Sequence, residues 1–159
     1  MMNESRFTAL AEKYMDMVYR IALNALGSVA DAEDVTQNVM VRLYRADPDF
    51  ESEEHAKRWL IRVAVNESKR FIGLPWKKRE ASLEEALNAS AEIDGPRNDL
   101  LRKVTGLPPK YRMPMYLYYY EGYSVKEIAE LTGSKTSTLQ TRLARGREKL
   151  REVLEEEMK

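Results

Sequence analysis

The most informative polar side chains lie between Lys126 and Arg151. This stretch carries seven Lys or Arg and three Glu, a net charge of +4 in a chain whose total formal charge is zero. At about 100° per residue, Thr141, Arg145 and Lys149 project from one side of a helix. Such a basic face suits nucleic-acid phosphates and base edges, although solvated helices of ordinary bundles can carry the same pattern. The concentration of positive charge favours nucleic acid.

The sequence also predicts the helices that position this face. Ser124, with Glu127 three residues later, predicts a capping box at the start of a short helix. Gly133 follows in a turn, where it can adopt a positive φ. A second helix is expected from about Thr136, with its apolar side formed by Leu139, Leu143, Leu150 and Leu154. Together they predict a helix-turn-helix (HTH).

Side chains that could carry out catalysis are scarce. The sequence has no cysteine and one histidine, His55, so thiolate metal sites and histidine-based metal or triad sites are not expected. Glu84 and Glu85 form a charged pair without an acid–base partner set, and the sequence has no glycine-rich phosphate loop. We therefore expect no enzyme, no metal, no cofactor and no small-molecule substrate. No signal peptide or long apolar run is evident, which predicts a soluble, unsecreted protein.

The apolar periodicity predicts an all-α fold with two small helical domains. Residues 1–72 are expected to form a three-helix bundle, with helices at about 5–26, 31–46 and 53–72. Residues 73–98 are polar and contain a Gly-Pro breaker, which indicates a flexible linker. Residues 99–159 are expected to form the second domain, with short helices at 99–105 and 110–121 before the HTH.

Two helices of the first domain carry polar surfaces. In the second helix, Val41 should face outward among Asp34, Gln37 and Arg45, which suits either a partner surface or a plain helix exterior. In the third helix, cations share one side, with an asparagine on its flank and an expected core tryptophan at its edge. These residues are Arg58, Arg62, Lys69, Asn66 and Trp59. They suit single-stranded nucleic acid, or are merely solvated.

Three stretches together resemble the extracytoplasmic-function (ECF) group of bacterial sigma factors. The first, DAEDVTQNVMVRLYR, is similar to the family's segment that binds core RNA polymerase. The second, WLIRVAVNESKRF, is similar to the segment that melts and reads the minus-10 element. The third is LPPKYR followed by the HTH, and it is similar to the domain that reads the minus-35 element. The resemblance covers nearly the whole chain, with the linker as the variable part.

The resemblance implies roles for individual residues. Asp34, Gln37 and Val41 match positions that dock on the clamp helices of the largest polymerase subunit. Phe50, Arg62, Asn66 and Lys69 match positions that contact the minus-10 strand, with Phe50 in the loop that receives a flipped base. Gln140, Thr141 and Arg145 match base-reading positions for the minus-35 element. Thr138, Arg142 and Lys149 are expected to hold phosphates.

Two positions depart from the family's pattern. Ser134 and Lys135 follow the turn glycine where an aliphatic and a capping residue are usual, so Ser134 or Thr136 is expected to cap the second HTH helix. Gly146 replaces a small helix former, which costs up to about 1 kcal/mol of helix propensity.

The resemblance implies a promoter-specificity subunit without catalysis of its own. Its expected partners are core RNA polymerase, promoter DNA and an anti-sigma factor that covers the polymerase-binding surfaces. Its expected location is the cytoplasm, where an anti-sigma factor could hold it at the membrane. The alternative is a free-standing HTH regulator, which would bind duplex DNA by itself, typically at a palindrome.

Overall fold

The computed structural model describes residues 1–73 and 106–158. These residues form helices, and no strand occurs among them, which confirms the all-α prediction. Their contacts divide the chain into two compact units between residues 79 and 80, and each unit is described by itself. The domain boundaries expected at 72/73 and 98/99 stay predictions. Residues 74–98 of the expected linker and the helix expected at 99–105 lie outside the described residues.

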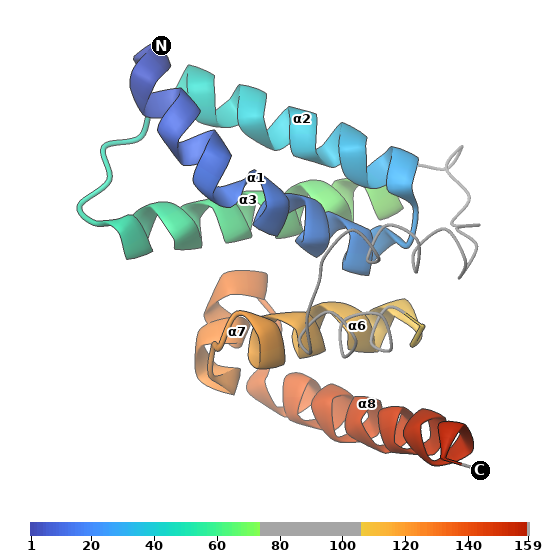
Figure 1. Ribbon diagram of the computed structural model, residues 1–159. Coiled ribbons are helices and arrows are strands. Elements are labelled where there is room, and N and C mark those ends of the chain that lie inside the picture. Colours follow the sequence, from blue (N-terminus) through green and yellow to red (C-terminus); the bar gives the residue numbers. More distant parts are fainter. Residues whose placement is uncertain (74–105, 159) are drawn as a thin grey trace. The chain divides into compact units, whose positions relative to one another are not determined.

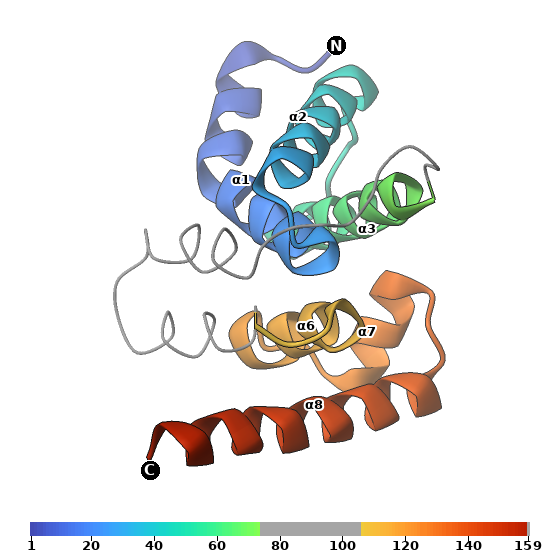
Figure 2. The same cartoon turned by 90° about the vertical axis from the view of Figure 1, so that its right-hand side faces the viewer.

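The first unit is a bundle in which each of three helices packs against the other two (Figure 1, Figure 2). The helices are α1 (Glu4–Leu26), α2 (Val29–Ala46) and α3 (Glu53–Ile72). Asn3, Ser28 and Ser52 cap their starts, where each side chain accepts backbone hydrogen bonds of 2.9–3.2 Å. Helix α2 begins two residues before the expected Asp31, because Ser28 provides its cap.

Packing of the three apolar stripes fixes which side of each helix faces outward. The predicted stripe of α2 is fully buried at Ala32, Val35, Val39 and Leu43. On α3, Leu60 and Ala64 are buried as predicted, together with Ile61 and Val65. The prediction of a core position for Trp59 was wrong, because its side chain is only half-buried and its ring contacts Phe50 of the preceding loop.

The second unit begins with a helix that changes its hydrogen-bond spacing. Helix α6 (Pro109–Met115) continues into a π-helix, η1 (Tyr116–Tyr120), where the N–H of Glu121 donates to the Tyr116 carbonyl at 3.2 Å. The sequence had predicted one regular helix over 110–121. Tyr116 and Leu117 are buried, whereas Met113 and Tyr120 are half-buried.

The HTH follows as α7 (Val125–Thr132) and α8 (Thr136–Glu157). The capping box is confirmed, because Ser124 Oγ accepts from the Glu127 N–H at 3.1 Å and the Glu127 carboxylate accepts from the Ser124 N–H at 3.0 Å. Gly133 ends α7 with φ +73°, as expected. The prediction of a Ser134 or Thr136 cap was wrong, since α8 starts after Lys135 without a side-chain cap.

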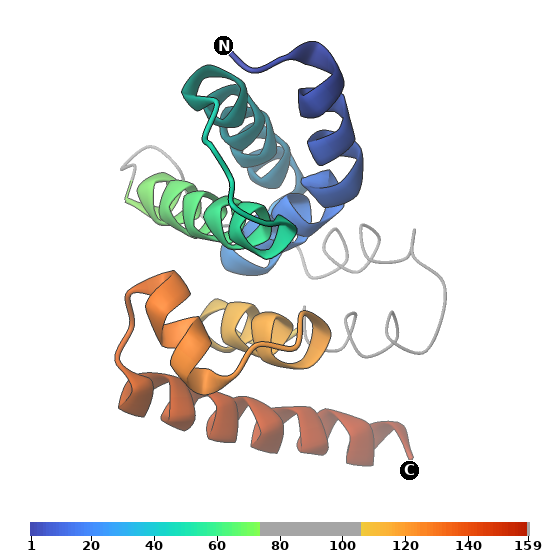
Figure 3. The ribbon, with the colours of Figure 1, turned by 90° about the vertical axis from the view of Figure 1, so that its left-hand side faces the viewer.

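Helices α6 and α7 lie on the same side of α8 (Figure 1, Figure 2, Figure 3). Their shared core contains Leu107, Tyr111, Met115, Leu143 and Leu150. At the expected apolar position Leu154, which follows this cluster along α8, the side chain is 37% exposed.

A glycine in α8 permits the close packing of α8 on α6. A Cβ added at Gly146 would lie 2.5 Å from Met115 Sδ and 3.4 Å from Tyr111 Cβ. Contact at 2.5 Å is below any ordinary van der Waals separation, so a side chain here would displace Met115. The helix-propensity cost that the sequence indicates at Gly146 is therefore the cost of a close helix–helix contact.

Gly146→Ala tests this contact through the sign of the change in the free energy of unfolding. Helix propensity alone predicts that alanine stabilises the unit by up to about 1 kcal/mol. The clash with Met115 predicts a net loss of about 1–3 kcal/mol, because overpacking forces neighbouring side chains to move. The free energy of unfolding, measured in urea, checks this outcome. Ala144→Gly on the exposed side of α8 is the matched control and should lose only the propensity term. A stabilised Gly146→Ala variant would contradict the packing argument.

Candidate functional site

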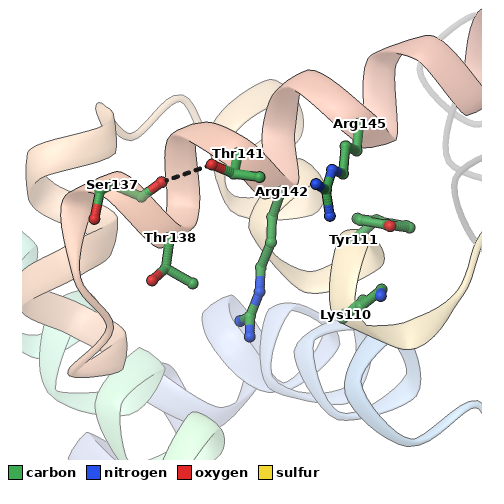
Figure 4. A pocket seen from close by; sticks show the side chains of 7 residues that line it. All are labelled: Lys110, Tyr111, Ser137, Thr138, Thr141, Arg142 and Arg145. Carbon is green, nitrogen blue, oxygen red and sulfur yellow. Dashed lines mark hydrogen bonds between the residues drawn. The ribbon is translucent and has the colours of Figure 1, made fainter.

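The outward face of α8 carries most of the residues expected to contact a duplex. Gln140, Thr141, Arg145 and Lys149 are exposed, while Thr138 and Arg142 are half-buried. On the opposite side, Leu139 and Leu143 are each 1% exposed. The Thr141 hydroxyl donates to the Ser137 carbonyl at 3.1 Å, which leaves the lone pairs of its oxygen available to accept a hydrogen bond (Figure 4).

A cleft joins this face to the start of α6. Its volume is about 390 Å³, and it is lined by Lys110, Tyr111, Ser137, Thr138, Thr141, Arg142 and Arg145. In Figure 4 the Arg145 side chain points from α8 toward Tyr111 on α6, with Lys110 beside it. Three cationic side chains therefore line the cleft, together with hydroxyl groups, and no carboxylate lines it among the described residues. This combination suits a phosphate.

Sequence reasoning did not identify Lys110 and Tyr111 as members of this surface. They lie in the LPPKYR stretch, which provided part of the resemblance, but they are about 30 positions from the α8 residues that they join. The only signal available in the sequence was a cation at the start of a helix. Its position next to Arg142 and Arg145 depends on how α6 packs against α8.

In the first unit, α3 presents the residues expected to contact an unpaired strand. Arg62, Asn66 and Lys69 are exposed and recur at intervals of four and three, so they share one side of the helix. Arg58 is different, because it is half-buried and its Nε lies 3.3 Å from a Glu54 carboxylate oxygen. That ion pair lowers the positive charge at the start of this face.

Phe50 lies in a loop that is held on two sides. Its ring is half-buried and makes edge contacts with His55 and Trp59, at centroid distances of 5.3 and 5.8 Å. Arg6 from α1 lies over the same ring and bonds to the Asp47 carboxylate at 2.9 Å and to the Pro48 carbonyl at 2.8 Å. The loop predicted to receive a base is therefore fixed to α1 and α3.

Helix α2 exposes the expected polymerase-docking residues. Asp34 and Gln37 are exposed, and Val41 is 48% exposed, which is unusual for an aliphatic side chain in the middle of a packed helix. An exposed valine among polar neighbours can form the apolar centre of a protein contact.

A buried glutamate connects α2 to α3 beside this surface. The Glu67 side chain is 4% exposed. Its carboxylate accepts from Arg70 Nε at 3.1 Å, Arg70 Nη2 at 2.5 Å and Asn38 Nδ2 at 3.2 Å. Arg42 Nη2 from α2 lies 3.4 Å from its other oxygen. The ionised form is therefore stabilised from both helices.

The pKa of Glu67 reflects two opposed effects. Burial raises the pKa, but the hydrogen bonds and charges of Arg70 and Arg42, with Asn38, outweigh burial and hold the pKa below its ordinary value. A lowered pKa in the folded state stabilises the fold at neutral pH, and this contribution is lost as the pH falls through the folded-state pKa.

Glu67→Gln therefore predicts a pH-dependent difference in stability. The variant should unfold more easily than the wild type at pH 7, because glutamine is uncharged and forms no ion pair with Arg42 or Arg70. The difference should decrease as the pH falls below about 4.5. Urea unfolding at a series of pH values measures it, and Glu33→Gln, at an exposed position of α2, is the control. A difference that stays constant down to pH 3 would show that charge does not stabilise this contact.

The described residues contain no helix that is both long and apolar enough to span a membrane.

Two family models match the chain: sigma-70 region 2 over residues 10–73 and sigma-70 region 4 over residues 97–150. The ECF RNA polymerase sigma factor SigW of Bacillus subtilis is 30% identical over 96% of this chain and 90% of its own length.

Two solved structures have a similar fold. The sigma factor RpoE, bound to the anti-sigma factor NepR from Bartonella quintana, covers 94% of this chain and 97% of its own, with 19% identity and a TM-score of 0.66. CnrH, bound to the cytosolic domain of CnrY, covers 96% of this chain and 90% of its own, with 25% identity and a TM-score of 0.61.

Proposed function

The chain belongs to the ECF group of sigma-70 family sigma factors, and from this premise we propose how its surfaces divide the work of promoter recognition. As a sigma factor, it associates with RNA polymerase and directs promoter recognition. Both family models match in sequence order, region 2 before region 4. That order favours a sigma factor over the free-standing HTH regulator.

We propose that α2 docks on the clamp helices of the largest polymerase subunit through Asp34, Gln37 and Val41. The observation that supports this assignment is the 48% exposure of Val41 on a helix whose opposite side is fully buried. A partner that covers Val41 would remove apolar surface from water, and this burial would favour binding. The polar neighbours Asp34 and Gln37 would form the rim of that contact.

Run-off transcription with purified core polymerase tests the docking assignment. The wild-type protein should direct initiation at its promoters only when core is present. The double variant Val41→Asp, Gln37→Ala should bind core at least about tenfold more weakly and lose transcripts in proportion, because a carboxylate is placed in the apolar contact. Met15→Asp, at a position of α1 that is 42% exposed, is the matched control and should behave as the wild type. Equal activity of the double variant and the wild type would show that the docking residues are wrong.

For the minus-10 element, we propose that Arg62, Asn66 and Lys69 contact the unpaired strand. Their common exposed side of α3 supports this role. The loop around Phe50 would receive one unstacked base, whose unstacking costs a few kcal/mol and is offset by contacts to its exposed edge. Because Arg6 fixes this loop in advance, little further ordering would be needed on binding.

For the minus-35 element, we propose that the exposed residues Gln140, Thr141 and Arg145 read base edges in the major groove. Thr138, Arg142 and Lys149 would hold phosphates, which sets register and not sequence. We add Lys110 to the phosphate contacts, because it lines the same cleft as Arg142 and Arg145.

Two substitutions separate base reading from phosphate binding. Arg145→Ala should reduce discrimination between the cognate and a changed minus-35 base pair by about 1–3 kcal/mol. Lys110→Ala should weaken binding of all sequences alike and lower the slope of log K against log salt by about 1. Holoenzyme binding to promoter fragments at several salt concentrations measures both, with Arg151→Ala on the exposed side of α8 as the control. Lost discrimination in the Lys110 variant, or unchanged discrimination in the Arg145 variant, would reverse these roles.

We propose that the protein is a non-catalytic subunit, with nucleotide chemistry left to the core polymerase, and that it acts in the cytoplasm. We also propose an anti-sigma factor as its regulator, because a protein with a similar fold is bound by one. Affinity purification from native cells tests the regulator. Recovery of core polymerase with no second bound protein, under every growth condition, would count against it.

A further inference from the structure

A cationic groove lies between α2 and α3, next to the proposed docking residues. Its volume is about 570 Å³, and it is lined by Asn38, Val41, Arg42, Arg45, Ala46, Glu67 and Arg70. Three arginines and one glutamate therefore face the same space, and α2 contributes five of the seven residues. Because the valine also belongs to the proposed docking surface, the groove continues that surface.

The buried glutamate orients two of these arginines without covering them. Arg70 and Arg42 both bond to Glu67, yet each side chain is 54% exposed. A guanidinium carries five N–H donors; two groups of Arg70 donate to Glu67, whereas Arg42 forms an ion pair with it at 3.4 Å. The two guanidinium groups are held at the surface, so a partner that binds them loses less side-chain entropy than it would with mobile arginines.

The groove and the docking residues overlap on one side of α2, where they share Val41. Asn38 and Arg45 lie four and eleven positions after Asp34, and Val41 lies seven positions after it. At about 100° per residue, these positions all fall within roughly 40° of Asp34 around the helix. A protein that covers Val41 therefore reaches the groove as well.

We propose that this groove receives carboxylate side chains of the core polymerase, as an electrostatic extension of the α2 docking site. The proposal rests on the proposed function, in which α2 contacts core. Charge complementarity identifies the chemistry: three arginines, of which two are already held by Glu67, match an acidic helix surface with an apolar residue for Val41.

A nucleic-acid strand is the less favoured occupant. The residues assigned to the minus-10 strand, Arg62, Asn66 and Lys69, do not line the groove. A strand would also place its phosphates beside the Glu67 carboxylate and would leave Val41 uncovered. A protein surface satisfies the apolar and the cationic groups together.

Arg45→Glu in the full-length chain is the test, because Arg45 lines the groove, whereas the ion pairs of Glu67 among the described residues are formed with Arg42 and Arg70. The dissociation constant for purified core polymerase should rise about tenfold at low salt, and the difference from wild type should shrink as salt increases. The unfolding midpoint should stay at the wild-type value, and Arg45→Gln should give an intermediate constant. Glu12→Lys, at an exposed position of α1, is the charge-reversal control and should bind core as the wild type.

The remaining outcomes separate this inference from the proposed function. If Arg45→Glu binds core as the wild type while Val41→Asp does not, the groove is not a docking site, although α2 still docks. If neither variant changes core binding, the docking assignment on α2 fails, and this inference fails with it. If Arg45→Glu binds core normally but its holoenzyme no longer opens promoter DNA, the groove belongs to the nucleic-acid surface and the inference is overturned.

Discussion

The packing of α2 against α3 is the contact on which the surfaces of the first unit depend. Apolar side chains such as Val39 and Leu60 are fully buried and fix the rotation of each helix. Glu67 of α3 then links the helices through Asn38 and Arg42 of α2, while Arg70 of α3 holds the same carboxylate. Because a helix that buries one side must expose the other, this packing leaves one face of α2 and one face of α3 exposed, which are the faces that we propose for protein and for an unpaired strand.

In the second unit, too, burial of one side of a helix exposes the other side, and here a glycine contact also contributes. Leu139 and Leu143 turn the polar side of α8 outward, while Gly146 brings α8 close to α6. That close packing places Lys110 beside the start of α8. There Lys110 adds positive charge to a cleft that Arg142 and Arg145 also line. Neutral overall composition thus coexists with a local cationic surface, which is what a DNA-binding domain attached to a larger assembly requires.

Local patterns were sufficient to predict most of the described helices and the outward faces of α2 and α8. The 3.6-residue period identified the exposed position of Val41, and the Ser124 and Glu127 pair marked the start of α7. What the sequence could not predict depends on contacts between distant segments. A glutamate on a helix is ordinarily solvated, so Glu67 gave no signal that Asn38, 29 positions earlier, would bond to it. Gly146 was interpreted as a propensity cost because Met115, its neighbour in space, belongs to another helix.

Site-specific photo-crosslinking in the promoter-bound holoenzyme tests the central claim most directly, namely that one bundle presents separate faces to protein and to DNA. A photoreactive amino acid at position 41 should crosslink to the largest polymerase subunit, and one at position 66 should crosslink to the non-template strand of the minus-10 element. Crosslinks from position 41 to DNA, or from position 66 to polymerase alone, would contradict the division of surfaces between α2 and α3.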